Sequence, residues 1–255
     1  MVLARSGSVA TLWLNRPAKR NAVTLAMWQA IPDHVAACAD DPTVRVLVVR
    51  GVGGAFCAGA DLADVGGDLA GGAYRDANHA AEVALAAFPK PAIALVQGPC
   101  MGGGCEIAVA CDLRFADTTA RFGITPARLG LVYPGYAVER TVQLLGPAAT
   151  KFLLFSGEHI DAARALQMGL VDELLEPDAL EARVYGFADV LSQRSLITQS
   201  AAKAMVADWY EHGEITDEMV RYWAEQLRQS PDLPEGVAAF LERRTPEFRW
   251  TGPTT

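Results

Sequence analysis

The sequence predicts an α/β protein whose last third is helical. Two observations predict it: buried-strand patterns alternate with helical patterns as far as Gly123, and from Gly135 onward the pattern is almost wholly helical. Alternation of this kind is typical of a sheet whose strand ends carry loops. We therefore expect an α/β body over residues 1–195 and a helical C-terminal region over residues 196–255.

The strands are predicted from short apolar runs. Residues 9–15 alternate between apolar and polar side chains, as a half-buried strand does, and Asn15, Arg16 and Pro17 end the run. Residues 44–50 are mostly β-branched and apolar, which is typical of a buried strand, and residues 91–98 are predicted to form another buried strand. Residues 112–123 suggest extended structure, and residues 170–175 suggest a short strand.

The helices are predicted from apolar periodicity and from their end signals. Thr24 is a good N-cap for a helix that reaches about Asp40, with Pro32 as an expected kink. Helical pattern returns from Tyr74 to Phe88 and again from Gly104. The later predicted helices are Glu139–Leu145, Ala148–Phe155, Ala162–Met168, Asp178–Gln193, Ile197–Tyr210, Asp217–Gln229 and Glu235–Arg243.

Composition and charge exclude several classes of function. Of the 255 residues, 51% are hydrophobic and 20% are charged, as in ordinary globular proteins, and the formal net charge of -8 disfavours binding to nucleic acid. An anionic ligand would therefore need a local basic cluster. No apolar run approaches the roughly 20 residues that span a bilayer, and the first residues do not resemble a signal peptide, so we expect a cytoplasmic protein that does not bind membranes.

Several common catalytic and metal-binding motifs are missing from the sequence. The five cysteines form no CxxC pair and have no nearby histidine, which argues against a zinc site and a disulfide framework. The sequence contains no phosphate-binding P-loop, no dinucleotide fingerprint and no GxSxG nucleophile motif. The four histidines do not neighbour an obvious nucleophile. We therefore predict no metal and no resident cofactor.

Two predicted strands end in glycine-rich loops that can present backbone N–H groups. In the first loop, residues 56–61, glycine allows a tight turn and the small side chain of Ala60 leaves its amide unobstructed. In the second, Gly102, Gly103 and Gly104 precede a helix, so their amides lie at its positive N-terminus. Two amides that converge on one oxygen make an oxyanion hole. The alternative is that the glycines only allow a strand and a helix to pack closely.

Four segments of this chain resemble the crotonase superfamily, the enoyl-CoA hydratase/isomerase group. They are LNRPAKRNAV, FCAGADL, GPCMGGGCEIAVACDLRFA and FGITPARLGL, and the similarity runs in order from about Val9 to Arg249. The pairing of FCAGADL with GGGCE is the specific part of it. The resemblance implies a spiral ββα core that holds the coenzyme A and acyl sites. It also implies a C-terminal helical region used in trimerisation, and homotrimers or dimers of trimers.

The resemblance also assigns roles to residues. It places the oxyanion N–H groups at Ala60 and Gly103, and it implies an acyl-CoA thioester substrate whose coenzyme A is the only cofactor involved. The helix Tyr74–Phe88 and the loop before it are expected to line the acyl pocket. Coenzyme A is expected to lie along the following residues, the first three of which supply positive charge for its phosphates: Arg16, Lys19, Arg20, Ala58, Asp61 and Leu62.

The catalytic residues of this chain depart from the family pattern at one position. Family hydratases use two glutamates, and Glu106, about one helical turn beyond Gly103, matches the first. Burial of Glu106 would raise its pKa and suit it to proton transfer. The second glutamate is expected in a stretch where this chain has Pro126, which can neither accept nor donate a proton. Addition of water to a 2-enoyl-CoA remains the leading prediction, with Glu106 as the evident acid/base.

Three alternatives stay open at this point. The stretch TPARLGLVY resembles methylmalonyl-CoA decarboxylase relatives, in which a tyrosine matches Tyr133, so Tyr133 is a second candidate catalytic residue. Against this, those enzymes carry histidine where this chain has Ala60. Glu139 or Asp117 is a further candidate for the missing carboxylate. The third alternative is an acyl-CoA binding protein without catalysis.

Overall fold

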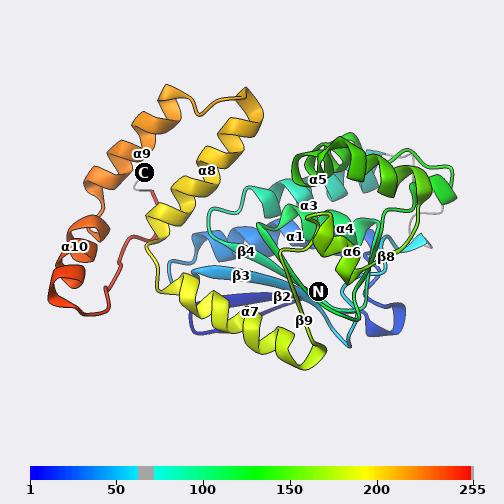
Figure 1. Ribbon diagram of the computed structural model, residues 1–255, viewed down its shortest axis with the longest axis horizontal. Helices are drawn as coiled ribbons and strands as arrows, with labels where there is room; N and C mark the ends of the chain where they lie inside the picture. The colour runs from blue at the N-terminus through cyan, green and yellow to red at the C-terminus, as the bar shows by residue number, and fades with distance from the viewer. Residues whose placement is uncertain (63–71, 254–255) are drawn as a thin grey trace.

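The structure is a computed structural model that describes residues 1–62 and 72–253. The loop before the predicted helix Tyr74–Phe88, which we expect to line an acyl pocket, falls mostly outside these residues. Figure 1 shows a central sheet covered by helices, with a helical arm beside it. No helix among the described residues is long and apolar enough to cross a membrane.

The main sheet has six strands in the order β1-β2-β3-β4-β6-β9. The β1 strand pairs antiparallel with β2, and every other pair is parallel. The bounds are Val2–Ser6, Val9–Leu14, Val46–Gly51, Ala92–Val96, Leu113–Asp117 and Glu173–Leu175. Four predicted strands are present within one to three residues of their expected bounds, and the extended segment predicted over residues 112–123 contributes β6 to this sheet. The β1 strand is an additional strand that the sequence pattern did not show.

Helices bury both faces of the β3–β4 centre of this sheet. Val46, Val48, Ile93 and Leu95 pack against α7 (Pro177–Ser192). The alternate residues of the same strands face the core that contains α1 (Leu25–Asp40) and α3 (Gly72–Ala86). Burial on both faces explains the unbroken apolar runs in these two strands.

A second, smaller sheet places the two glycine-rich loops next to each other. It contains β5 (Pro99–Met101), β7 (Arg121–Gly123) and β8 (Ile160–Asp161). An isolated bridge between Cys57 and Cys100 ties the first loop to β5, which leads directly into α4 (Gly103–Ala110). The loops that follow β3 and β5 therefore meet at one place.

The rest of the chain is helical, as predicted. The α5 helix (Gly135–Ser156) is interrupted at Gly146, where φ is 73° and Pro147 follows, so the two predicted helices on either side of this point are confirmed. The helix α6 (Ala162–Gln167) and two 3-10 turns, η1 (Pro17–Lys19) and η2 (Pro126–Arg128), complete the body. The predicted N-cap is also confirmed, because Thr24 accepts from Met27 N, and α1 runs on through Pro32.

The C-terminal arm consists of α8 (Leu196–His212), α9 (Asp217–Gln229) and α10 (Asp232–Glu242). It lies to one side of the sheet-bearing body in Figure 1. A small apolar cluster of its own contains Leu196, Ile197, Trp223 and Trp250. The predicted boundary at residue 195 falls just before α8, and the division of the chain into two domains there stays a prediction.

Candidate functional site

The loop after β3 turns sharply so that the Ala60 amide points away from the chain's own acceptors. Gly59 has a φ of 101°, which favours glycine, and the neighbouring amides are used: Ala58 N donates to Arg20 O at 2.9 Å and Asp61 N to Val23 O at 2.9 Å. The short parallel bridge between Val23 and Ala60 holds the loop against the segment that precedes α1.

The second amide belongs to Gly103, the first residue of α4. Gly102, with a φ of 46°, turns the chain into this helix, and its carbonyl accepts from Glu106 N at 3.1 Å. A Cβ atom at Gly103 would lie 2.9 Å from Cζ2 of Trp28 and 3.6 Å from Ala60 N. Position 103 therefore needs glycine, and its backbone lies beside the Ala60 amide.

Neither of these two amides has an acceptor. Within residues 1–62 and 72–253, Ala60 N and Gly103 N donate no hydrogen bond. Unpaired backbone donors are uncommon in protein interiors, where most are satisfied. Two such donors at one place, one of them at a helix N-terminus, can bind a single oxygen that carries negative charge.

Glu106 lies one turn along α4 from Gly103 and is only 8% exposed. Its Oε2 accepts a hydrogen bond from Nδ2 of Asn78 at 2.8 Å. Burial raises the pKa of the Glu106 carboxyl, while its interactions with Asn78 and Tyr133 lower it. In the described part of the chain no cation forms an ion pair with Glu106. A carboxyl group in this setting is suited to exchange a proton with a bound molecule.

Tyr133 lies beside Glu106, so the structure brings both predicted catalytic side chains to the two amides. Its hydroxyl donates to the Gly102 carbonyl at 3.3 Å. Burial, together with the nearby Glu106 carboxyl, raises the Tyr133 pKa well above its usual value. Tyr133 therefore keeps its proton and can act as a hydrogen-bond donor.

The predicted coenzyme A residues lie around the outer side of the first loop. Nη2 of Arg16 pairs with Oδ2 of Asp61 at 2.8 Å, and Nη1 of Arg16 donates to the Ala22 carbonyl at 2.7 Å. Lys19 and Arg20 are exposed and, in the described ranges, take part in no ion pair. The side chain of Leu62, the last residue before the undescribed segment, is also exposed. Asp61 offsets the charge of Arg16, which leaves Lys19 and Arg20 as the available cations.

The other candidate carboxylates do not replace the missing second glutamate. Pro126 begins η2 and offers no side-chain donor or acceptor. Asp117 is buried, but it accepts hydrogen bonds from Thr119 N at 2.9 Å and from Gln97 Nε2 at 3.0 Å, so it stabilises a turn. Glu139 is exposed on α5, where Gln143 donates to it at 3.5 Å.

The structure adds four polar side chains that the sequence interpretation missed. Asn78 and Glu82 are buried on α3, and Tyr136 and Arg140 approach them from α5. The sequence contained a signal for the two residues on α3. The buried face of this helix consists of Asn78, Ala81, Glu82 and Leu85, which have the spacing of an apolar stripe. A glutamate in such a stripe is uncommon and indicates a specific environment.

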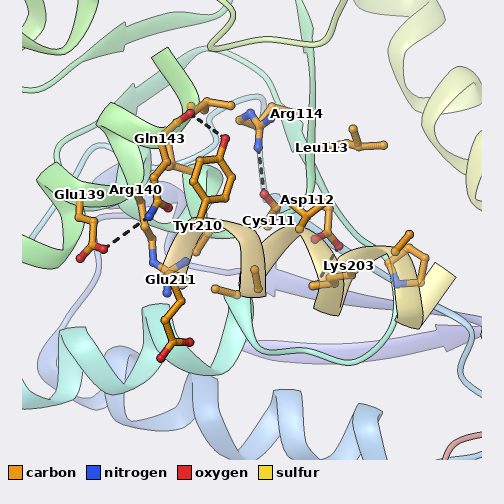
Figure 2. A pocket seen from close by; sticks show the side chains of 18 of the residues that line it. Cys111, Asp112, Leu113, Arg114, Glu139, Arg140, Gln143, Lys203, Tyr210 and Glu211 are labelled. Carbon is orange, nitrogen blue, oxygen red and sulfur yellow. Dashed lines mark hydrogen bonds and ion pairs between the residues drawn. The ribbon is translucent and has the colours of Figure 1, made fainter. Parts of the chain in front are cut away.

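A cavity of about 920 Å³ lies between α8, the C-terminal end of α4 and the first half of α5 (Figure 2). Across it, Lys203 of α8 pairs with Asp112 at 2.9 Å, and the Tyr210 hydroxyl donates to the Gln143 carbonyl at 3.1 Å. Arg140 also lines it, but Ala60 and Gly103 do not. This cavity is therefore distinct from the place where the two amides meet.

Comparison with known proteins agrees with the arrangement of the loops. The sequence profile of the family described as enoyl-CoA hydratase/isomerase matches residues 4–251. This chain belongs to the enoyl-CoA hydratase/isomerase family. The 2,3-dehydroadipyl-CoA hydratase of Escherichia coli K12 is 32% identical to it over 252 residues, which are 98% of each chain. The crotonyl-CoA hydratase of Syntrophomonas wolfei is 32% identical over 97% of each chain.

Solved structures of the enoyl-CoA hydratase/isomerase family share its fold. An enoyl-CoA hydratase/carnithine racemase from Magnetospirillum magneticum superposes with a TM-score of 0.92 at 30% identity, over 96% of this chain and 94% of that one. A family protein from Hyphomonas neptunium gives 0.90 at 34% identity, over 97% and 96%. The predicted crotonase fold, with a helical C-terminal region, is confirmed.

Proposed function

We propose that this protein is an enoyl-CoA hydratase-type enzyme that adds water across the C2=C3 bond of a 2-enoyl-CoA. The observation that carries the proposal is the buried Glu106 carboxyl, one helical turn from the Gly103 amide and with no cation paired to it in the described residues. An acyl-CoA substrate is consistent with the family. The Ala60 and Gly103 amides serve as the oxyanion hole in this proposal.

The reaction balances with one glutamate. The Glu106 carboxylate accepts a proton from water while the water oxygen bonds to C3, and the C2=C3 electrons move into the thioester enolate. The two amides stabilise the enolate oxygen, a type of contribution worth roughly 2.7–4 kcal/mol for each donor in a known case. The Glu106 carboxylic acid then gives its proton to C2, which restores the carboxylate. Asn78 fixes the position of Oε2 during this exchange.

The other predicted site residues take roles in substrate binding. We propose that Lys19 and Arg20, with Arg16 held by Asp61, meet the phosphates of coenzyme A, and that Ala58 and Leu62 border it. Coenzyme A then arrives with the substrate, and the proposed chemistry needs no resident cofactor. The cytoplasmic location stays a prediction.

Loss of the enoyl absorbance of crotonyl-CoA tests this proposal. Purified protein is expected to turn it over, and Glu106→Gln is expected to lose nearly all of that activity because the proton acceptor is gone. Glu139→Gln is the matched control, since that carboxylate is exposed on α5. Absence of turnover on short and long enoyl thioesters, or full activity in Glu106→Gln, would refute the hydratase assignment.

The second candidate is decarboxylation of a malonyl-type CoA thioester, favoured by the partly buried Tyr133 hydroxyl beside Glu106. In this reaction the bond from C2 to the carboxylate breaks, its electrons enter the enolate, carbon dioxide leaves and C2 takes a proton. Release of carbon dioxide from methylmalonyl-CoA, lost in Tyr133→Phe, would select it. Tight acyl-CoA binding with neither reaction would select a non-catalytic binding protein.

The C-terminal arm supports a proposal about assembly. Large apolar side chains are exposed on α8 and α10, among them Trp209 at 50%, Phe240 at 83% and Leu241 at 75%. Exposed apolar patches commonly mark protein interfaces. We propose that these helices form the contacts of a homotrimer or of a dimer of trimers.

A further inference from the structure

Glu82 is a buried carboxyl that has no hydrogen-bond partner among the described residues. Its side chain is 1% exposed, and in the described part of the chain neither of its oxygens accepts or donates a hydrogen bond. The nearest cation is Arg140, whose Nε lies 4.0 Å from Oε2, and that side chain is 30% exposed. An ionised carboxylate buried in this way would be costly, so such groups hold their proton instead.

The position of Glu82 relative to Glu106 follows from two matched helical spacings. On α3, Asn78 and Glu82 are four residues apart, and on α5, Tyr136 and Arg140 are four residues apart. The Tyr136 hydroxyl donates to Asn78 Oδ1, and Arg140 pairs with Glu82. Because residues at this spacing share a helix face, Glu82 lies one turn along from the amide that holds Glu106.

The charged and titratable groups that face Glu82 come from three elements. Glu106 lies on α4, Tyr133 precedes α5, and Tyr136 and Arg140 lie on α5. Burial first, and the Glu106 charge second, raise the Glu82 pKa to about 9, while Arg140 lowers it in part. Asn78 and Tyr133 lower the pKa of Glu106, and they contribute nothing comparable to Glu82. Glu106 also accepts the Asn78 hydrogen bond, whereas within the described residues both oxygens of Glu82 lack one, so Glu106 is the carboxyl better placed to carry a negative charge.

We propose that Glu82 is a positioning residue that stays a neutral carboxylic acid beside Glu106, so that the two carboxyls together carry one negative charge while Glu106 acts, and that ionisation of Glu82 stops the reaction. The proposal rests on the proposed function, in which Glu106 exchanges a proton with the substrate. Its physical basis is repulsion. A second negative charge in a buried site opposes the negative charge that develops on the enolate.

The pH dependence of kcat/KM for crotonyl-CoA tests this role, since kcat/KM reports ionisations of the free enzyme. The wild-type profile is expected to fall on its alkaline side as Glu82 ionises. In Glu82→Gln the side chain is neutral at every pH, so kcat/KM is expected not to fall at alkaline pH. The fall of kcat/KM at acid pH, which reflects protonation of Glu106, is expected to remain. An unchanged alkaline limb in Glu82→Gln would overturn the proposal.

Arg140→Gln tests the same proposal independently, because it changes the cation that pairs with Glu82. Removal of this cation takes away an interaction that lowers the Glu82 pKa, so the alkaline limb is expected to move to higher pH. Arg140→Lys keeps the charge and is expected to move it less. A shift of the limb to lower pH in Arg140→Gln would contradict the proposal.

Infrared titration of the wild-type protein without substrate separates this proposal from the proposed function. A carbonyl band of a neutral carboxylic acid is expected at neutral pH, where exposed carboxyls are ionised, and it should vanish at alkaline pH and in Glu82→Gln. Absence of the band at neutral pH overturns the proposal whatever the enzyme does. If the band is present and no thioester reacts, the catalytic role falls with the proposed function and the buried acid stands.

Discussion

At the scale of single residues, partners decide which of two buried carboxyls ionises. Glu106 and Glu82 are both buried, and burial is the main cause that raises the pKa of each. Glu106 accepts a hydrogen bond from Asn78, whereas Glu82, within residues 1–62 and 72–253, accepts none and pairs with Arg140 at 4.0 Å. Burial therefore leaves Glu106 as the candidate base and Glu82 as a carboxylic acid that keeps its proton.

The retained proton on Glu82 makes the stability of the fold depend on pH. Its pKa rises from 4.5 to about 9 on folding, so between these values the folded chain holds a proton that the unfolded chain has released. The free energy of unfolding should fall as pH rises through this window, by at most about 1.4 kcal/mol per pH unit. Urea unfolding at several pH values should show a smaller fall in Glu82→Gln.

Glu139→Gln, in which an exposed carboxylate is removed, should keep the wild-type dependence on pH. Equal slopes in Glu82→Gln and the wild-type protein would mean that Glu82 is ionised in the folded state.

Gly103 offers a second test at this scale. The added Cβ in Gly103→Ala would lie 2.9 Å from the Trp28 ring, so the ring or the helix start must move and the amide with it. We expect kcat/KM to fall roughly 10²-fold or more, the scale of losing one oxyanion donor. Gly186→Ala, where a Cβ meets nothing within 4 Å, should keep full activity. Wild-type activity in Gly103→Ala would argue against a role for this amide.

Sequence alone could place the residues that lie in short motifs. Ala60, Gly103 and Glu106 belong to two glycine-rich segments, and Tyr133 follows shortly after the segment FGITPARLGL. Glu82 could not be assigned in this way, because its meaning depends on how α3 packs against α4 and α5. Its only sequence signal is a charged residue within an apolar stripe. The ion pair of Arg16 with Asp61 also depends on the fold, since 45 residues separate the two.

At the scale of elements, α3 and α5 act together because their polar residues share one spacing. Asn78 and Glu82 meet Tyr136 and Arg140 in order along the two helices. A substitution on α3 should therefore alter the pKa of the Glu106 carboxyl, which lies on α4.

Asn78→Ala tests this coupling. The hydrogen bond from Asn78 lowers the Glu106 pKa, so its loss should raise that pKa. The acid limb of kcat/KM should consequently move to higher pH. Val83→Ala, on the exposed side of α3, serves as the control and should leave the limb in place. A limb that moves to lower pH would contradict the assignment.

The ends of helices could be predicted from the local sequence more reliably than the edge strand of the sheet. The break of α5 at Gly146 was predictable because glycine and proline follow each other there. The β1 strand was not, because four of its five side chains are exposed and no apolar alternation marks it. Its hydrogen bonds to β2 define it instead.

At the scale of the whole molecule, the arm of α8, α9 and α10 exposes apolar surface that a single chain leaves uncovered. Trp209, Phe240 and Leu241 are each at least half exposed. We expect sedimentation to give three or six times the mass of one chain. Phe240→Ser with Leu241→Ser should weaken this association, whereas the exposed Arg228→Ser of α9 should not. A monomer at all concentrations would refute the proposed assembly.

In the proposed function, the Ala60 and Gly103 amides polarise a thioester carbonyl. Infrared spectroscopy of crotonyl-CoA labelled with ¹³C at that carbonyl, bound to the inactive Glu106→Gln protein, measures this directly. We expect a carbonyl stretch at lower frequency than in free crotonyl-CoA, with a smaller displacement when Gly103→Ala is added. A bound thioester whose carbonyl frequency equals that of the free ligand would contradict it.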